Sequence, residues 1–236
     1  SVFQEDSSYS NPNLKRWKMV ENVRPMTPER KKRFREVIEK RQPGLTVVLE
    51  NVHDPHNIAA VLRTSDSVGI YRIYILYTNG QEIPRKLKLG KRASAGARRW
   101  VDVLAFSDAE ACFHQVRTHC DTVYGTHLTE QACELYDMDL TGRVALVFGN
   151  EHQGISEEVL DLCDGNFHIP QAGMSRSLNI SVACAVTLYE AFRQRQKAGL
   201  YTDQSRLTSH QRQSLHLEYE RRHREKISNR TLKRMD

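Results

Sequence analysis

The turn from a strand into a helix is predicted by the stretch Ile169-Pro170-Gln171-Ala172-Gly173-Met174-Ser175-Arg176-Ser177-Leu178-Asn179-Ile180-Ser181-Val182-Ala183. Pro170 has no backbone N–H and ends the strand, while Gly173 can adopt backbone angles that other residues avoid. From position 180 to position 189 the sequence is apolar nearly all round, which is typical of a helix buried on every side. We therefore expect this helix to lie in the core.

This turn carries more polar residues than the start of a helix requires. Ser177, Asn179 and Ser181 carry hydroxyl and amide groups, and Arg176 adds a positive charge. One interpretation is a generous N-cap, because serine and asparagine are favoured at that position. The other is a ligand site, in which the free N–H groups of the first helical turn face a polar small molecule.

Outward from this turn, short apolar runs alternate with helical patterns. The predicted strands are 45–49, 71–77, 101–105, 122–127, 143–148 and 166–169. The predicted helices begin at Thr27, Asp54, Ser107, Ser156 and Asn179, and a basic helix without a core of its own follows from about position 208. This alternation predicts an α/β protein with a mainly parallel sheet. The strand ends near 127, 149 and 170 should lie on one edge of the sheet, where such proteins bind ligands.

Composition indicates an ordinary globular protein that is not a membrane protein. The 236 residues are 39% hydrophobic and 27% charged, with no apolar run of membrane length and no recognisable signal peptide. The cysteines are odd in number and scattered, and none forms a C-x-x-C pair: Cys112, Cys120, Cys133, Cys163 and Cys184. This usage predicts reduced core thiols in a cytoplasmic protein, rather than a disulfide or zinc framework.

The net charge of +6 is distributed unevenly. Residues 1–44 contain 11 basic and 6 acidic side chains, residues 200–236 contain 9 and 5, and residues 45–199 contain 15 and 18. Seven basic residues of the middle part lie close together in sequence: Arg85, Lys86, Lys88, Lys91, Arg92, Arg98 and Arg99. Such charges are either solvated surface or a footprint for a polyanion, and basic ends around an acidic core favour the polyanion.

Several common sites are excluded by missing motifs. The sequence has no G-x-x-x-x-G-K-[ST] loop, no G-x-G-x-x-G after a strand and no G-x-S-x-G elbow. His53 and His56 flank Asp54, but they lack the glutamate and the helical context of a zinc protease. We therefore predict no metal site.

Three ordered motifs resemble those of a known family. The third is the stretch quoted above, and the first two are Asn57-Ile58-Ala59-Ala60-Val61-Leu62-Arg63-Thr64 and Leu146-Val147-Phe148-Gly149-Asn150-Glu151-His152-Gln153-Gly154-Ile155-Ser156. Residues 42–200 resemble the SpoU/TrmH family of RNA ribose 2'-O-methyltransferases, within the SPOUT superfamily. The resemblance implies a C-terminal deep trefoil knot and S-adenosyl-L-methionine (AdoMet) as the cofactor, without a metal. It also implies a homodimer with the helix from Asn179 at its interface.

The resemblance assigns roles to nine residues. The positions that contact AdoMet in the family match Thr126, Gly149, Ile169 and Leu178. The catalytic arginine matches Arg63, the residue that supports it matches Asn57, and polar active-site positions match Glu151, Ser177 and Asn179. From the residues alone, Asn57 can also be explained as a helix N-cap, and Arg63 as a surface arginine with its stem packed along the helix.

The role of Arg63 has two versions. The family's usual proposal makes a deprotonated arginine the general base. We favour a protonated Arg63 that orients the 2'-OH or a phosphate and stabilises the developing alkoxide, because arginine is hardly ever deprotonated. The sequence does not decide between them.

The third motif departs from the family's common Ile-Pro-Met-x-Gly-Met-Val-Gln-Ser-Leu-Asn at three positions, which Gln171, Ser175 and Arg176 occupy. Because Arg176 adds charge beside the expected active site, these departures bear on fine substrate specificity more than on activity.

The predicted organisation is a basic N-terminal extension with one helix (1–44), a SPOUT methyltransferase domain (45–199) and a basic C-terminal helical extension (200–236). An extension of about 44 residues is too short for a separate RNA-binding domain. Short helical extensions at both ends resemble the tRNA enzyme that methylates a D-loop guanosine at position 18, so we expect tRNA as partner. The alternatives are another RNA or tRNA position, a catalytically silent RNA-binding protein on the same scaffold, and a small-molecule α/β enzyme.

Overall fold

The computed structural model describes residues 26–80, 83, 96–174, 177–202, 206–224 and 233–234. Three features singled out in the sequence lie outside these residues. They are the N-terminal arm, the part of the basic loop that holds Arg85, Lys86, Lys88, Lys91 and Arg92, and two of the positions that differ from the family's third motif, Ser175 and Arg176. Within the described residues, no helix is long and apolar enough to cross a membrane.

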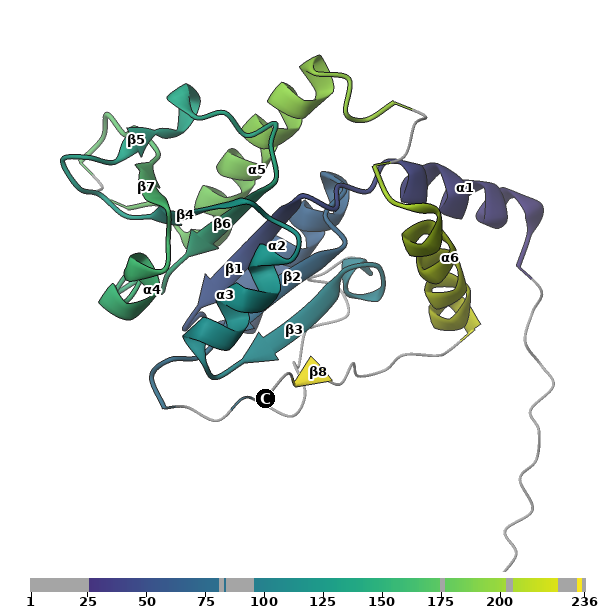
Figure 1. Ribbon diagram of the computed structural model, residues 1–236, viewed down its shortest axis with the longest axis horizontal. Coiled ribbons are helices and arrows are strands. Elements are labelled where there is room, and N and C mark those ends of the chain that lie inside the picture. The colour runs from purple at the N-terminus through teal and green to yellow at the C-terminus, as the bar shows by residue number, and fades with distance from the viewer. Residues whose placement is uncertain are drawn as a thin grey trace, which may run out of the picture.

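The strands form one sheet, in which every pairing is parallel (Figure 1). In the described part of the chain its order is β5-β7-β4-β6-β1-β2-β3-β8. The predicted strands are confirmed as β1 (Leu45–Glu50), β2 (Arg72–Leu76), β3 (Asp102–Phe106), β4 (Thr122–Thr126), β6 (Val144–Phe148) and β7 (Gly165–His168). The edge strands β5 (Cys133–Glu134) and β8 (Lys233–Arg234) were not predicted, since two residues have no readable periodicity.

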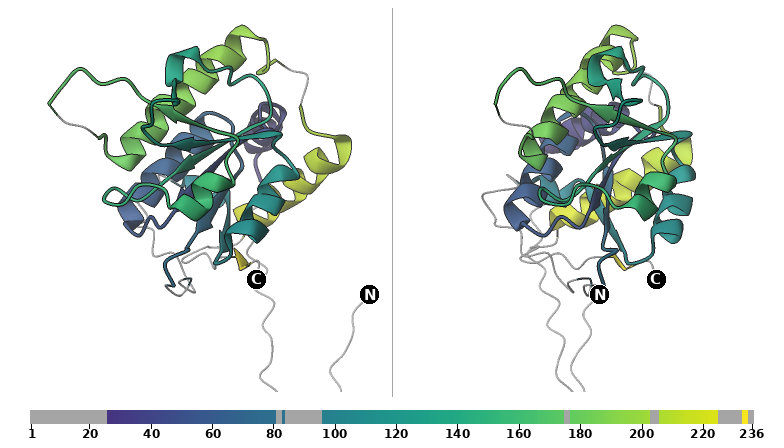
Figure 2. Two further views of the ribbon diagram at one scale, coloured as in Figure 1. Left: turned by 60° about the vertical axis from the view of Figure 1, so that its left-hand side comes forward. Right: turned by 90° about the vertical axis from the view of Figure 1, so that its left-hand side faces the viewer.

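Helices cover both faces of the sheet, so the core has three layers (Figure 2). On one face, α2 (Pro55–Ser67) and α5 (Ile180–Lys197) pack on alternate strand residues such as Val47 and Leu49. On the other face, α3 (Ala109–Arg117) and α4 (Glu157–Asp161) pack on the residues between them, such as Val48. Strands buried on both faces read as continuous apolar runs, which explains the sequence of β1. The trefoil knot implied by the resemblance stays a prediction.

The prediction that α5 is buried on every side is wrong for the single chain. Ile180, Cys184 and Leu188 are buried, but Val182 is 47% exposed and Tyr189 is 53% exposed. The helix α5 has more apolar surface than one face of the sheet can cover. One side of this helix therefore presents apolar side chains outward.

The two basic extensions do not behave as separate tails. α1 (Pro28–Glu39) packs beside α6 (Ser209–Arg224) (Figure 1), and Phe34, Ile38 and Tyr219 belong to one small apolar cluster. The expectation that the C-terminal helix has no core of its own therefore needs correction, because it shares one with α1. Sequence reasoning missed this because the two partners lie at opposite ends of the chain.

Buried arginines fasten this unit to the sheet domain. Arg41 is fully buried, and its guanidinium donates to the hydroxyl of Tyr219 at 2.9 Å and to the carboxylate of Asp66 in α2 at 2.7 Å. Arg222 of α6 is also buried and pairs with Asp102 of β3. Part of the positive charge counted in the extensions is therefore buried in ion pairs within the protein and is not exposed to a polyanion.

Candidate active site

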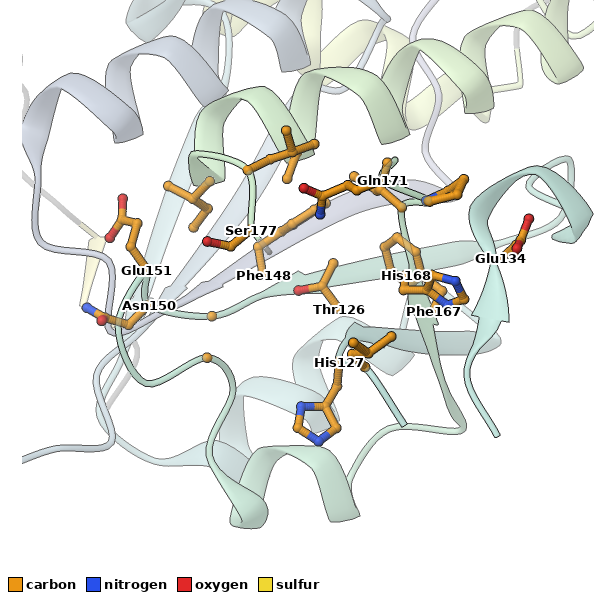
Figure 3. A pocket seen from close by; sticks show the side chains of 18 of the residues that line it. Thr126, His127, Glu134, Phe148, Asn150, Glu151, Phe167, His168, Gln171 and Ser177 are labelled. Atoms are coloured by element: carbon orange, nitrogen blue, oxygen red, sulfur yellow. The ribbon is translucent and has the colours of Figure 1, made fainter. Parts of the chain in front are cut away.

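A pocket of about 770 Å³ opens at the edge of the sheet where β4, β6 and β7 end. This position confirms that the strand ends near 127, 149 and 170 meet at one edge. Figure 3 shows Glu151 and Glu134 at opposite ends of the pocket, with Thr126 and Ser177 between them. The walls combine apolar rings such as Phe148 and Phe167 with a few polar groups, which is the usual make-up of a small-molecule site.

All four residues matched to cofactor contacts line this one pocket. Thr126 comes from the end of β4, Gly149 from the end of β6, Ile169 from the end of β7, and Leu178 from the segment before α5. The hydroxyl of Thr126 donates to the carbonyl of Val147 at 3.1 Å, which joins the neighbouring strand ends. Parallel strands bring these distant positions together, as the sequence predicted.

The loop after β6 requires glycine at its first position. A Cβ on Gly149 would collide with backbone atoms of Gly154, because residues 150 and 154 pair as a short antiparallel bridge. The side chain of Asn150 closes the loop further: its Nδ2 donates to the carbonyl of Asn51 at 2.9 Å. Gly149 leaves room for this close approach, and Gly154 has a φ of 70°, so both glycines help the chain to fold tightly beside the pocket.

Three of the predicted catalytic residues form one hydrogen-bonded row. Asn179 Nδ2 donates to Asn57 Oδ1 at 3.2 Å, and Asn57 Nδ2 donates to the carboxylate of Glu151. Asn179 also caps α5, since its Oδ1 accepts from the backbone N–H of Ser181 at 2.9 Å. The row connects the first turn of α2, the pocket loop and the first turn of α5.

The interpretation of Asn57 as an N-cap is wrong. The cap of α2 is Asp54, whose carboxylate accepts from the backbone N–H of His56 at 2.8 Å. Asn57 is buried, and both ends of its amide are used in the row to Glu151 and Asn179.

Ser177 and Arg63 lie in different surroundings. Ser177 lines the pocket. Arg63 does not: its side chain is exposed on α2, and it forms no hydrogen bond or ion pair within the part of the chain that the structure describes. Arg63 lies one turn before Ser67, whose hydroxyl is 3.5 Å from that of Tyr189 on α5. Arg63 therefore belongs to the surface that carries the exposed apolar side of α5.

Sequence reasoning missed Glu50, the last residue of β1. Its carboxylate is fully buried and accepts from Ser156, at the far end of the pocket loop, and from Thr78 after β2. An acidic residue after an apolar strand looks like an ordinary strand end. A functional role for Glu50 could have been suspected only from the position of β1 between β2 and β6, which buries its last residue.

The two histidines near this edge have structural contacts. The ring of His53 stacks on the ring of Tyr77 at 5.3 Å, and its Nε2 lies 3.3 Å from Asn79 Nδ2. The backbone of His56 binds the Asp54 cap. Among the described residues, no group of three or more His, Cys, Asp or Glu side chains is arranged to hold a metal.

Comparison with known proteins gives a consistent result. The tRNA (guanosine(18)-2'-O)-methyltransferase of Thermus thermophilus is 44% identical over 185 residues, which cover 78% of this chain and 92% of that protein. The crystal structure of the A. aeolicus TrmH/SpoU tRNA modifying enzyme matches with a TM-score of 0.72 and 33% identity, covering 81% of this chain and 94% of that one.

A second similar structure is the SpoU methyltransferase AviRb from Streptomyces viridochromogenes in complex with the cofactor AdoMet. It matches with a TM-score of 0.58 and 26% identity, covering 68% of this chain and 64% of that one. The model of the SpoU rRNA Methylase family matches residues 44–189, a range that holds all three motifs. With its parallel sheet, its pocket and its motif residues in these places, the chain belongs to the SpoU rRNA Methylase family.

Proposed function

We propose that this protein is an AdoMet-dependent tRNA methyltransferase that transfers a methyl group to the ribose 2'-OH of guanosine 18 in the D-loop. The observation that carries the proposal is the convergence of all four cofactor-matched residues on one pocket, beside the row formed by Asn57, Glu151 and Asn179. The relative at 44% identity, which this chain covers over 92% of its length, is named for that reaction.

The pocket fits AdoMet in size and chemistry. Its volume of about 770 Å³ lies within the range of cofactor sites. The carboxylates of Glu134 and Glu151 suit a ligand that carries an ammonium and a sulfonium, and the rings of Phe148 and Phe167 supply apolar walls. Nδ1 of His168, which also lines the pocket, is buried and has no hydrogen-bond partner within the described residues, so a polar ligand atom could satisfy it. Bound AdoMet supplies an activated methyl group, and this chemistry needs no metal.

We assign the remaining steps to residues of the chain. Gly149, Thr126, Ile169 and Leu178 would hold the cofactor, and Ser177 would line the approach to it. Arg63 would orient the 2'-OH and stabilise the negative charge that develops on the 2' oxygen as the hydroxyl proton passes to solvent and the oxygen takes the methyl group. Asn57, Glu151 and Asn179 would keep the pocket loop and the starts of α2 and α5 in a fixed arrangement, so that little reorganisation is needed during the reaction.

A homodimer would complete this site. The exposed side of α5, with Val182 at 47% and Tyr189 at 53% exposure, is an apolar surface that a second copy would cover. Arg63 lies on the same side of the molecule as Tyr189, because Ser67, one helical turn after Arg63, contacts the hydroxyl of Tyr189. In the dimer that we propose, the long helix from Asn179 forms the interface and Arg63 of one chain reaches the pocket of the other.

The extensions would bind the tRNA. We propose the limits 1–44 and 200–236 for them and 45–199 for the methyltransferase domain, with α1 and α6 acting as one unit. Lys31 and Arg35 are exposed on one side of α1, and neither forms an ion pair within the described part of the chain. Free cations of this kind are available to tRNA phosphates. A cytoplasmic location fits a tRNA substrate and five cysteines that are all free thiols.

The decisive assay is nucleoside mass spectrometry. Unmodified tRNA would be incubated with the full chain and labelled AdoMet, then digested into nucleosides and into fragments that cover the D-loop. We expect labelled 2'-O-methylguanosine in the D-loop fragment and none in tRNA with adenosine at that position. A label in another fragment or only in rRNA would make it a methyltransferase of another target. Binding of tRNA without any label would make it a silent RNA-binding protein.

A further inference from the structure

Glu50 is a buried carboxylate without a cation. Its side chain is 0% exposed, and it forms no ion pair within the residues that the structure describes. A buried charge is costly unless hydrogen bonds replace its hydration. Oε2 accepts from the backbone N–H of Ser156 at 2.9 Å, while Oε1 accepts from the hydroxyls of Ser156 at 2.5 Å and Thr78 at 2.8 Å.

The direction of these hydrogen bonds requires an acceptor at Glu50. The hydroxyl of Ser156 caps α4 by accepting from the backbone N–H of Val159, so its own hydrogen is left for Glu50. The hydroxyl of Thr78 accepts from Asn51 Nδ2 at 2.8 Å, so its hydrogen also points to Glu50. Every neighbouring donor is directed at the carboxylate. A glutamine amide would place its own N–H₂ against some of these donors.

This arrangement fixes both ends of the pocket loop, residues 149–156. At the far end, Glu50 holds Ser156 directly. At the near end, Asn150 Nδ2 binds the carbonyl of Asn51, and Asn51 is held in turn because its Oδ1 accepts from the backbone N–H of Thr78 at 3.0 Å. Asn51 has a φ of 52°, a left-handed conformation in which asparagine is tolerated and side-chain hydrogen bonds help. Gly149 at the start of this loop and Glu151 between its two held ends both line the pocket.

We propose that Glu50 is a positioning residue for the cofactor: it holds the pocket loop so that Gly149 and Glu151 form their side of the site. Glu50 does not line the pocket and acts through Ser156 and Asn51. The inference rests on the proposed function in one respect, that AdoMet binds in this pocket. This role explains why the core keeps a carboxylate that has no cation as partner directly beside the loop of the cofactor pocket.

The test compares Glu50→Gln with a control on the same strand. Thr46 is also buried in β1, at the other end of the strand, and its hydroxyl donates to the carbonyl of Arg72 at 2.8 Å. Thr46→Val and Glu50→Gln each remove buried hydrogen bonds, so both should lower the melting temperature. Titration calorimetry with S-adenosylhomocysteine, at a temperature where all variants are folded, should show weaker binding for Glu50→Gln alone, by about tenfold or more.

Steady-state kinetics add a second readout. Glu50→Gln should raise KM for AdoMet and leave KM for tRNA unchanged, a split that a merely structural role would not produce. If Glu50→Gln does not fold, Thr78→Val removes one donor to Glu50 and one acceptor from Asn51 but keeps the carboxylate, and it should weaken S-adenosylhomocysteine binding to a smaller extent. Folded variants that bind within twofold of the wild type would overturn the role of Glu50 alone. A wild-type protein that does not bind S-adenosylhomocysteine would overturn this inference and the proposed cofactor together.

Discussion

The pocket and the surface around Arg63 are built in opposite ways. In the pocket, side chains from three strand ends and two loops converge. Beside it, Asn57, Glu151 and Asn179 are hydrogen-bonded to one another. Around Arg63, an unpaired guanidinium lies exposed near Tyr189, which is 53% exposed. The resemblance assigns both surfaces to one active site, yet one chain keeps them apart. The difference supports our proposal that each chain contributes two half-sites, which a second copy would join.

The largest effect is expected from Arg63→Ala. If Arg63 acts chiefly in the transition state, kcat should fall by about 10²–10³ while AdoMet and tRNA still bind almost normally. Single-turnover methylation and two separate binding titrations measure these quantities. Wild-type turnover in this variant would mean that Arg63 is an ordinary surface arginine and that the surface around it is not part of the active site.

Arg63→Lys separates the two versions of its role. Lysine keeps the charge but loses the planar fork, so it should recover little activity at any pH if orientation matters. If the residue accepts a proton instead, activity should return as pH rises toward ~10, where lysine begins to lose its proton. A pH–rate profile of this variant from neutral to alkaline pH distinguishes the outcomes.

The pocket is tested by Leu178→Asp. Leu178 lines the cavity and is 36% exposed, so a carboxylate there would lose its hydration when a ligand covers it. We expect S-adenosylhomocysteine binding to weaken by at least about tenfold in calorimetry, with tRNA binding retained. Val182→Asp, on the outward side of the neighbouring helix α5, is the matched control for the pocket and should leave cofactor binding by the folded protein intact. Unchanged affinity in Leu178→Asp would place the cofactor elsewhere.

The contribution of the extensions is best measured by charge substitution rather than deletion. Removing α1 would also uncover Tyr219, so a truncation would mix unfolding with a loss of phosphate binding. Lys31→Gln combined with Arg35→Gln should make the slope of log K against log salt shallower, by about 0.9 for each phosphate of duplex RNA that is no longer neutralised. Arg33→Gln is the control, since Glu36 already offsets that charge at 3.7 Å. Equal slopes in all variants would mean that the exposed charges only solubilise the protein.

A smaller effect is expected from Tyr219→Phe. Burial raises the pKa of Tyr219, so its hydroxyl stays protonated and can donate to the carbonyl of Trp100 at 3.0 Å while it accepts from Arg41. Removing the hydroxyl leaves Arg41 Nε buried without a partner, which typically costs about 1–3 kcal/mol. Denaturant unfolding should show that loss, with S-adenosylhomocysteine affinity unchanged. A variant as stable as the wild type would mean that the Arg41–Tyr219 hydrogen bond contributes nothing to the attachment of α6.

The sequence was informative where function depends on local order along the chain. Parallel strand ends and three motifs predicted the pocket and its four cofactor-matched residues, because the edge of a parallel sheet gathers such ends automatically. It misled where two nearby residues could both cap the same helix. Asp54 rather than Asn57 caps α2, since the aspartate directly precedes Pro55. It also misled for α5, whose apolar sequence is the same whether the sheet or a second chain covers it.

Other features depend on contacts that a sequence does not display. The Arg41–Tyr219 hydrogen bond joins residues 178 positions apart, so the joint packing of both extensions had no local signal. Glu50 was overlooked because its importance comes from being buried beneath Ser156 and Thr78. Charge counting overestimated the free cations of the extensions, since Arg41 and Arg222 are buried and paired.

The central claim, that Arg63 of one chain acts at the pocket of another, is tested most directly by mixing two impaired variants at an AdoMet concentration too low to saturate Leu178→Asp. Arg63→Ala keeps an intact pocket, and Leu178→Asp keeps an intact Arg63. Coexpressed with different affinity tags, they should form mixed dimers in which one of the two sites has both intact parts. We predict recovery of about a quarter of wild-type tRNA methylation in the whole mixture, by random assortment in a twofold dimer. A mixture no more active than the separate variants would contradict the account and place Arg63 and the pocket of the same chain in one site.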